Sequence, residues 1–470
     1  MKTKYPNLFG ILAALMLVAS FVVPANLVSP ATVAADPGIC KWDTIREPNS
    51  LIGTYAITNC SDIVDLAVAS DFNTVYALVN INTAAGPRVI LLQSAVKGLL
   101  WSASRQNALA REAQWITLGV DDLFQVAVAP DNPNFVAVTS DNGTAANGPV
   151  QVWVSQNGGS DWDYTNLPVL AAGETIRCID ISVDYGGRRD LAVGTVTGTG
   201  AGRVFVVKST GFSGWLVQNT TPLGAVDFFA LKFSPSYASD SSMVLVFADN
   251  ATYACTDASG WQGATYYNIA LRDIDQNTIP VGGWAFPGKG IEVRDATWAV
   301  GSSPGLLQLN KADLELPSDF SGQAASLRRS YISLDAFVGC LVDKYDCARD
   351  GIFRIDDSTP YTLMDTHSIR DKSIYSIAYF GTYASGKLLA GERMGYPCTA
   401  TVPTWFTDSP TTCPIPCWYP ALKPTTGAAC GAGGLPGYAC AVGNKCGVGA
   451  AIVAWAPPGT LAYVATGSKA

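Results

Sequence analysis

The chain has 470 residues, of which 48% are hydrophobic and 14% charged, and its formal net charge is −8 at pH 7. It contains no run of Lys and Arg that could form the positive surface required to bind a nucleic-acid backbone, so we expect no nucleic-acid partner. Its 45 Gly and 27 Pro residues argue against long helices, and its content of Val, Thr, Tyr, Phe and Trp favours strands.

The first predicted element is a secretion signal, residues 1–35. Two lysines precede an apolar run from Leu8 to Val23, which Pro24 ends, and small residues at 33–35 suit cleavage. The alternative is a membrane anchor, but the run is shorter than the ~20 residues that a membrane span needs. We therefore expect a secreted protein at the extracellular cell surface, with a mature chain of 36–470 and no membrane span after signal cleavage.

A strand–turn–strand unit recurs along the mature chain. The first copy runs from Asp65–Asp71 into Thr74–Leu78, and the second from Gln125–Asp131 into Asn134–Val138. Spacings of about fifty residues between such units are typical of a propeller. The turns of the seven copies fall near residues 71, 131, 184, 236, 318, 381 and 458.

The second half of each unit supports two further strands, often joined through a Trp, which we interpret as a packing layer. We therefore expect an all-β fold, a β-propeller of about seven four-stranded blades over residues 36–470. The last unit lacks its outer strands, although Lys41–Ile45 could supply one of them. Either the ring closes imperfectly or the chain is a fragment of a longer protein, and we favour the fragment.

The stretch Val152–Trp162, which reads VWVSQNGGSDW, fits the pattern Ser-x-Asp/Asn-x-Gly-x-x-Trp with Ser155, Asn157, Gly159 and Trp162. Ser and Asn side chains can accept hydrogen bonds from the turn backbone, and Gly allows a positive φ. The stretch resembles an Asp-box, the hairpin signature of the bacterial-neuraminidase-repeat propellers. That superfamily includes sialidases, xyloglucan-type glucanases, sortilin-like receptors and photosystem II assembly-factor-like proteins, and bacterial surface propellers are the nearest. The resemblance implies a fold and a structural role for these four residues, but no activity.

Twelve cysteines follow the signal, and an even number in an exported chain indicates disulfides. Cys40 with Cys60, and Cys340 with Cys347, are plausible local pairs. We expect the Cys-rich range 394–449 to be a disulfide-bonded insertion in the sixth unit, with its pairing open, and we expect no metal site because no histidine is near. Its six candidate disulfide cysteines are Cys398, Cys413, Cys417, Cys430, Cys440 and Cys446.

The resemblance to sialidases implies an arginine triad, an Asp acid/base and a Tyr/Glu nucleophile. The first arginine of that family lies in a Phe-Arg-Ile-Pro motif before the Asp-boxes. Here Phe353-Arg354-Ile355-Asp356 follows them and ends in Asp. We therefore interpret Arg354 as an exposed arginine on an outer strand.

A glycosidase of another type would need two carboxyl groups roughly 5–10 Å apart. Several acids near predicted strand ends could meet at the central face, although acids beside turns are usually solvated. The single histidine, His367, argues against histidine-dependent triads and multi-histidine metal sites. The acids in question are Asp121, Asp122, Asp184, Asp227 and Glu392.

No catalytic set can be chosen from these residues, and we expect no catalytic residue and no cofactor. The sequence favours a secreted, non-enzymatic propeller of a microbial surface or envelope, such as a surface-layer component, with cell-surface proteins or glycans as partners. The alternative is an extracellular glycoside hydrolase, sialidase-like or glucanase-like, that uses carboxylates on the central face. A third possibility is an assembly chaperone like the photosystem-associated propellers.

Overall fold

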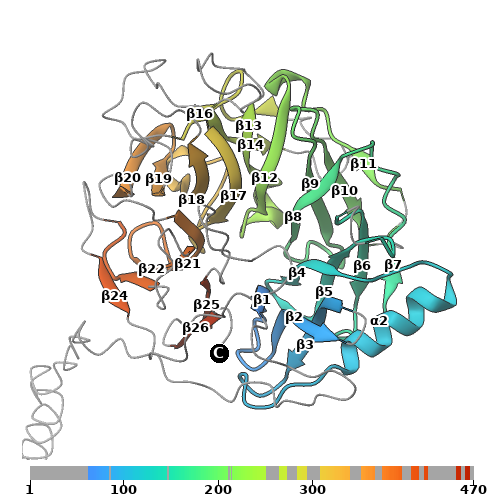
Figure 1. The fold of residues 1–470 in the computed structure, drawn as a ribbon. Coiled ribbons are helices and arrows are strands. Elements are labelled where there is room, and N and C mark those ends of the chain that lie inside the picture. Colours follow the sequence, from blue (N-terminus) through green and yellow to red (C-terminus); the bar gives the residue numbers. More distant parts are fainter. Residues whose placement is uncertain are drawn as a thin grey trace, which may run out of the picture. The chain divides into compact units, whose positions relative to one another are not determined.

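In a computed structural model of the chain, antiparallel sheets form a ring around a central axis (Figure 1). The structure describes residues 62–83, 86–144, 148–209, 212, 214–249, 264–271, 283–293, 307–338, 351–365, 373–393, 404–411, 418–421, 451–456 and 461–465.

Six of the sheets in this part of the chain are blades of three to five strands. Blade one contains β1 (Asp62–Val68), β2 (Val75–Thr83) and β3 (Gly86–Ser94). Blade two contains β4 (Leu123–Ala129), β5 (Asn132–Ser140), β6 (Gln151–Ser155) and β7 (Asp163–Tyr164). Blade three contains β8 (Thr175–Ile181), β9 (Asp190–Val196), β10 (Val204–Lys208) and β11 (Leu216–Val217).

The other three blades follow in chain order. Blade four contains β12 (Val226–Phe233), β13 (Ser242–Asp249) and β14 (Thr265–Leu271), with β15 (Gly283–Trp284) and β16 (Ile291–Glu292) both paired to β14. Blade five contains β17 (Leu307–Glu315), β18 (Arg329–Val338), β19 (Gly351–Asp356) and β20 (Thr359–Asp365). Blade six contains β21 (Ser373–Gly381), β22 (Gly386–Arg393), β23 (Thr404–Thr407) and β24 (Tyr419–Ala421).

A two-stranded sheet of β25 (Ile452–Ala456) and β26 (Leu461–Ala465) lies between blades six and one. The first strand of each sheet is innermost, and these strands are neighbours in the order β1, β4, β8, β12, β17, β21 and β25, which returns to β1 (Figure 1). The described helical segments are α2 (Ser104–Trp115), α3 (Tyr237–Asp240), η3 (Thr221–Leu223) and η4 (Ala325–Leu327).

Apolar side chains fill the space between adjacent blades. Val244 and Ile269 of blade four, for example, belong to one buried cluster with Leu314, Ile332 and Phe353 of blade five. Each radial sheet therefore buries both of its faces, and its strands are apolar on both sides. Among the described residues, no helix has the length and apolar character that a membrane span requires.

The blade number differs from the expected seven four-stranded blades. Each of the seven predicted strand–turn–strand units is an antiparallel pair, but the pair β25–β26 has no third strand among the described residues, so six blades remain. Among the described residues blade one has three strands, and helix α2 packs against β3 on the side where the fourth strand of another blade would lie. Buried Ala108 and Leu109 of this helix contact the same cluster as Leu91 of β3.

The expected Cys-rich insertion is also corrected in part. Strands β23 and β24 lie within 394–449 and pair in succession onto β22, so this range supplies the outer half of blade six. All ten candidate disulfide cysteines, together with His367, lie outside the described residues.

The hairpin from β6 to β7 has the hydrogen bonds that its sequence pattern predicts. Ser155 Oγ accepts the amide hydrogens of Gly159 at 2.7 Å and Asn157 at 3.3 Å. Gly159 has a φ of +82°, and a Cβ there would lie 3.2 Å from the side chain of Arg105. Trp162 is buried and its indole N–H donates to the carbonyl of Arg105 at 3.3 Å. The hairpin thus joins blade two to helix α2.

One residue is inserted at the same place in each inner strand of the six blades. The register skips a single residue there, as in a β-bulge. A bulge bends a strand and redirects its side chains, so these positions shape the centre of the ring. The bulge residues are Val64, Phe124, Arg177, Phe229, Asn310 and Tyr375.

Ser155→Ala should destabilise the fold by about 1–3 kcal/mol, because the buried Gly159 amide loses its acceptor. Equilibrium denaturation measures this change in the free energy of unfolding. Ser239→Ala is the matched control, since the Ser239 hydroxyl is exposed, and it should change stability by less than about 0.5 kcal/mol. Equal effects of the two substitutions would contradict the structural role of the Ser155 turn.

Candidate functional site

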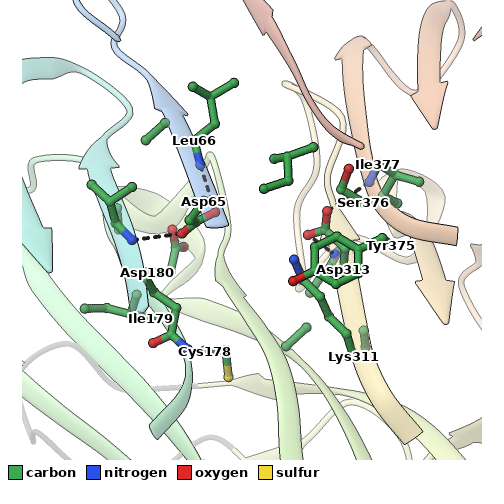
Figure 2. A pocket seen from close by; sticks show the side chains of 18 of the residues that line it. Asp65, Leu66, Cys178, Ile179, Asp180, Lys311, Asp313, Tyr375, Ser376 and Ile377 are labelled. Atoms are coloured by element: carbon green, nitrogen blue, oxygen red, sulfur yellow. Dashed lines mark hydrogen bonds between the residues drawn. The ribbon is translucent and has the colours of Figure 1, made fainter. Parts of the chain in front are cut away.

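The inner strands enclose a cavity of about 770 Å³ at the axis of the ring. Residues of all seven inner strands line it. Figure 2 shows Asp65 and Asp180 on one side and Lys311, Asp313 and Tyr375 on the other. Charged side chains from sheets far apart in the sequence therefore meet in one place.

Two of the cavity acids tie neighbouring blades together. Asp65 on β1 accepts the amide hydrogens of Leu66 at 3.0 Å and of Val126, on blade two, at 2.8 Å. Asp313 on β17 accepts those of Leu314 at 2.9 Å and of Ile377, on blade six, at 2.9 Å. Because both carboxylate oxygens of each residue accept hydrogen bonds from backbone amides, these acids have a structural role.

Asp180 on β8 makes a similar tie but to blade four, where the Phe233 amide donates to its Oδ2 at 2.8 Å. Burial raises the pKa of Asp180 to about 6, against the opposing effect of Lys232. Burial also raises the pKa of Asp65 to about 6. These two carboxyl groups of the cavity therefore titrate at a pH well above the ordinary range for an aspartate.

Glu315 at the end of β17 differs from the other acids because a side chain holds it. Lys232 Nζ donates to Glu315 Oε1 at 2.6 Å, and the two side chains are 33% and 20% exposed. Burial raises the pKa of Glu315 to about 7, with Lys232 opposing the shift and Asp313 and Asp180 adding to it. Glu315 is thus a carboxylic acid that can hold a proton near neutral pH and faces open space.

Lys232 is the cation that interacts with several acidic side chains of the cavity. Burial alone would lower its pKa, but the carboxylates of Glu315, Asp180 and Asp313 outweigh burial and raise the pKa above the ordinary value. Lys232 remains an ammonium group at every physiological pH. It can therefore stabilise negative charge on Glu315 or Asp180 after either of them loses a proton.

The cavity offers little for metal or thiol chemistry. In the described ranges, no group of three or more His, Cys, Asp or Glu side chains is placed to hold a metal ion. Cys178 lines the cavity as a free thiol. Burial raises its pKa to about 12, so it is a poor nucleophile.

The acids nominated from the sequence lie elsewhere, and none of them lines the cavity. Asp121 pairs with Arg88 at 3.0 Å. Asp227 is buried and accepts the amide hydrogens of Thr197, Gly200 and Gly202, so it shapes a loop. Asp122 accepts the Val89 amide, Asp184 accepts the Gly187 amide, and Glu392 accepts the indole N–H of Trp405.

The interpretation of Arg354 as an exposed arginine is wrong. Its residue is 1% exposed on β19, and its guanidinium contacts Asp356 at 3.0 Å and donates to the carbonyl of Pro410 at 3.0 Å. It lies in blade five and does not line the cavity. The four Asp-box residues are likewise outside the cavity.

The sequence signal that was missed is the alternation Lys311-Ala312-Asp313-Leu314-Glu315. Alternate residues of a strand share a face, and charged residues on an inner strand must meet at the hub. The inner strands that contain Asp65, Asp180 and Lys232 carry the same signal more weakly, because each has only two charged residues and these are not at alternate positions.

The comparisons with known proteins concern the fold. No protein-family model and no curated protein matches this sequence. The structure is similar to the α-L-arabinofuranosidase Arb93A of Fusarium graminearum, with a TM-score of 0.41 and 10% identity over 75% of this chain and 93% of that one. It is also similar to an α-L-arabinanase of Penicillium chrysogenum, with a TM-score of 0.40 and 9% identity over 74% and 92% of the two chains.

The expectation of a non-enzymatic surface scaffold is contradicted. It depended on the lack of an assembled set of catalytic side chains, and the ring brings Asp180, Glu315 and Lys232 together in one cavity.

The substitution Glu315→Gln tests whether the Glu315 carboxyl group is protonated in the folded protein. Its pKa is higher in the folded protein, about 7, than the ordinary 4.5, so folding favours its protonated form. The stability that this provides is complete below about pH 4.5 and lost as the pH rises to about 7. The free energy of unfolding of the wild type, relative to Glu315→Gln, should therefore fall over this range.

Denaturant titrations at several pH values measure this difference. Asp163→Asn, on exposed strand β7, serves as the control for a carboxyl substitution outside the cavity. A difference between wild type and Glu315→Gln that stays flat or rises from pH 4.5 to 7 would show that Glu315 titrates normally.

Proposed function

We propose that the protein is a secreted glycoside hydrolase that cleaves its substrate in the central cavity. The observation that carries this proposal is the grouping of Glu315 and Asp180, two carboxyl groups from different blades, around Lys232 in an open cavity. Glycoside hydrolysis needs one carboxyl group that donates a proton and one that is ionised. The cavity holds acids whose surroundings differ enough to divide these roles.

Glu315 is the proposed proton donor. Its pKa of about 7 keeps it protonated under mildly acidic conditions, as protonation of a leaving-group oxygen requires. Lys232, at 2.6 Å, stabilises the carboxylate that remains after transfer. In the return step the same carboxylate can accept a proton from water.

Asp180 is the proposed ionised partner. Hydrogen bonding to the Phe233 amide orients its carboxylate, and its pKa of about 6 lies below that of Glu315. When Asp180 is ionised and Glu315 is protonated, the two carboxyl groups can divide the roles of the reaction. Asp180 can then act on the sugar as a nucleophile or activate a water molecule.

The secretion signal predicted from the sequence at residues 1–35, which lie outside the described part of the chain, supports an extracellular site of action. The hydrogen bonds of Ser155 and the buried Trp162 support membership of the Asp-box propellers. The partner under this proposal is a glycan.

Hydrolysis of a panel of chromogenic glycosides and polysaccharides tests the proposal. The panel contains sialosides, β-glucans, uronides and α-L-arabinofuranosides, the last because of the activity of the similar solved enzymes. Glu315→Gln and Asp180→Asn should each lower kcat/KM by roughly 10²–10⁴-fold. The control Asp163→Asn should leave it unchanged.

The dependence of kcat/KM on pH provides a second readout. Activity should fall below about pH 6 as Asp180 gains a proton and above about pH 7 as Glu315 loses its own. A lack of turnover across the panel, or turnover that survives both substitutions, would contradict the proposal.

A further inference from the structure

Three aromatic residues occupy equivalent places in alternate inner strands. Phe124, Phe229 and Tyr375 are the bulge residues of blades two, four and six, and all three line the cavity. The bulge falls at the same point of each inner strand, so the repeat of the fold relates the three rings to one another. Differences between their surroundings therefore show what is particular to each ring.

Two of the three rings have a cation over them, which comes from the preceding blade. The Arg177 guanidinium of blade three lies 5.9 Å from the ring centroid of Phe229. Lys311 Nζ of blade five lies 3.7 Å from the ring centroid of Tyr375. Arg177 is the bulge residue of β8, and Lys311 directly follows the bulge residue of β17. Each cation is attracted by the face of the ring next to it.

The pair formed by blades one and two differs, because it has no such cation. The corresponding residues of β1 are Val64, the bulge residue, and Asp65, which follows the bulge as Lys311 does in β17. Among the described residues, no cation lies over the Phe124 ring and Asp65 forms no salt bridge. An acidic side chain thus occupies the place that a cation has in the other two pairs of blades.

Asp65 and Phe124 lie close enough for one ligand group to contact both. Asp65 Oδ2 accepts the amide hydrogen of Val126 at 2.8 Å, and Val126 follows Phe124 by two residues on β4. Two residues span about 6.6 Å of a strand. An ammonium group binds a carboxylate oxygen at about 2.8 Å and an aromatic face within about 6 Å of the ring centroid. Both side chains line the cavity and are half-buried, so a ligand in the cavity can reach them.

The charge of the cavity also favours a cationic ligand. Five acidic and three cationic side chains of the described residues line its wall. Lys311 lies on the opposite side of the cavity from Asp65 (Figure 2) and attracts its carboxylate. Burial outweighs this attraction and raises the pKa of Asp65 to about 6. The negative charge of Asp65 is therefore only partly balanced by the protein.

We propose that the cavity binds an amino sugar, a glycan unit with a free amino group, whose ammonium lies between the Asp65 carboxylate and the Phe124 ring. The ligand supplies the cation that Arg177 and Lys311 supply to the other two rings. This inference rests on the proposed function, since it assigns the substrate class of the same cavity. A neutral sugar leaves Asp65 without a counter-ion, and an acidic sugar brings a second negative charge beside it.

The charged groups that act on Asp65 set the limits of this affinity. Lys311 repels a bound ammonium, whereas Asp313 attracts it. The inner strands beside β1, which are β4 and β25, contain no charged residue. Each oxygen of Asp65 accepts one backbone amide hydrogen and keeps a lone pair for a further donor.

Binding of the ammonium should depend on pH through Asp65. With a pKa of about 6, this carboxyl group is mostly ionised at pH 7 and mostly protonated at pH 5. Only the ionised form attracts a cation. The affinity for an amino sugar should therefore be about tenfold lower at pH 5 than at pH 7, in proportion to the ionised fraction.

Calorimetric titration of the full chain with matched ligands tests the inference. The probes are the methyl β-thioglycosides of glucosamine, N-acetylglucosamine and glucose, in which sulfur replaces the glycosidic oxygen and hinders cleavage. At pH 7 the glucosamine ligand should bind about tenfold more tightly than either of the other two. Ethanolamine, which carries an ammonium group without a sugar ring, should bind more weakly than the glucosamine ligand.

Substitutions assign the preference for the amine to its two contacts. Asp65→Asn keeps an oxygen for the Val126 amide but removes the charge, so it should abolish the preference. Phe124→Leu should reduce the preference by about threefold, since it removes the ring face. The controls are Asp163→Asn on β7 and Phe72→Leu at an exposed turn of blade one, and both should leave the preference unchanged.

Equal affinities for the three sugars, no binding of the glucosamine ligand, or a preference that survives in Asp65→Asn would each overturn the inference. If Asp65→Asn fails to fold, the wild type and Phe124→Leu decide. A preference that is the same at pH 5 and pH 7, or that Phe124→Leu leaves unchanged, would then overturn it. Ethanolamine binding as tightly as the glucosamine ligand would overturn the assignment to a sugar.

The two proposals fail separately. Selective binding of the amino sugar without hydrolysis of any glycoside would support this inference and contradict the hydrolase. Hydrolysis of neutral glycosides by a protein without preference for the amine would do the reverse.

Discussion

The ring depends on carboxylates that accept amide hydrogens across the boundary between blades. Asp65 joins blades one and two, Asp180 joins three and four, and Asp313 joins five and six. Apolar packing between the radial sheets is not directional, whereas these bonds fix the position of one inner strand against the next. Their cost is that charged groups must lie close together in a confined space.

That confinement gives the cavity its chemistry. Burial shifts the pKa of Asp180 to about 6 and of Glu315 to about 7, and lysines balance the remaining charge. Acids that are partly protonated near neutrality are common at catalytic sites. The bulges add a second component, because the bulge residues Phe124, Phe229 and Tyr375 bring aromatic side chains to the wall of the cavity. The features that close the ring and those that would act on a glycan are therefore built from the same strands.

The sequence predicts the inner strands well because the alternation of residue types that indicates a strand lies within a few neighbouring residues. The propeller fold and the turn at Ser155 could also be predicted, because the patterns that indicate them lie within short stretches of the sequence. The number of blades could not be predicted, since in the described part of the chain helix α2 packs beside the three strands of blade one and β25 pairs with β26 alone. The cavity residues were missed because Asp65 and Lys311 become neighbours only when the ring closes. Acids near strand ends are conspicuous in a sequence, but Asp227 accepts amide hydrogens from the loop between β9 and β10 and does not line the cavity.

The chemistry of the central cavity depends on a carboxyl group that stays protonated near neutral pH. Carbon-13 NMR of protein labelled at the glutamate carboxyl carbons measures this directly, with the spectrum of Glu315→Gln assigning the signal. The Glu315 signal should titrate at about pH 7. A Glu315 signal that titrates near 4.5, the ordinary value for this side chain, would contradict it.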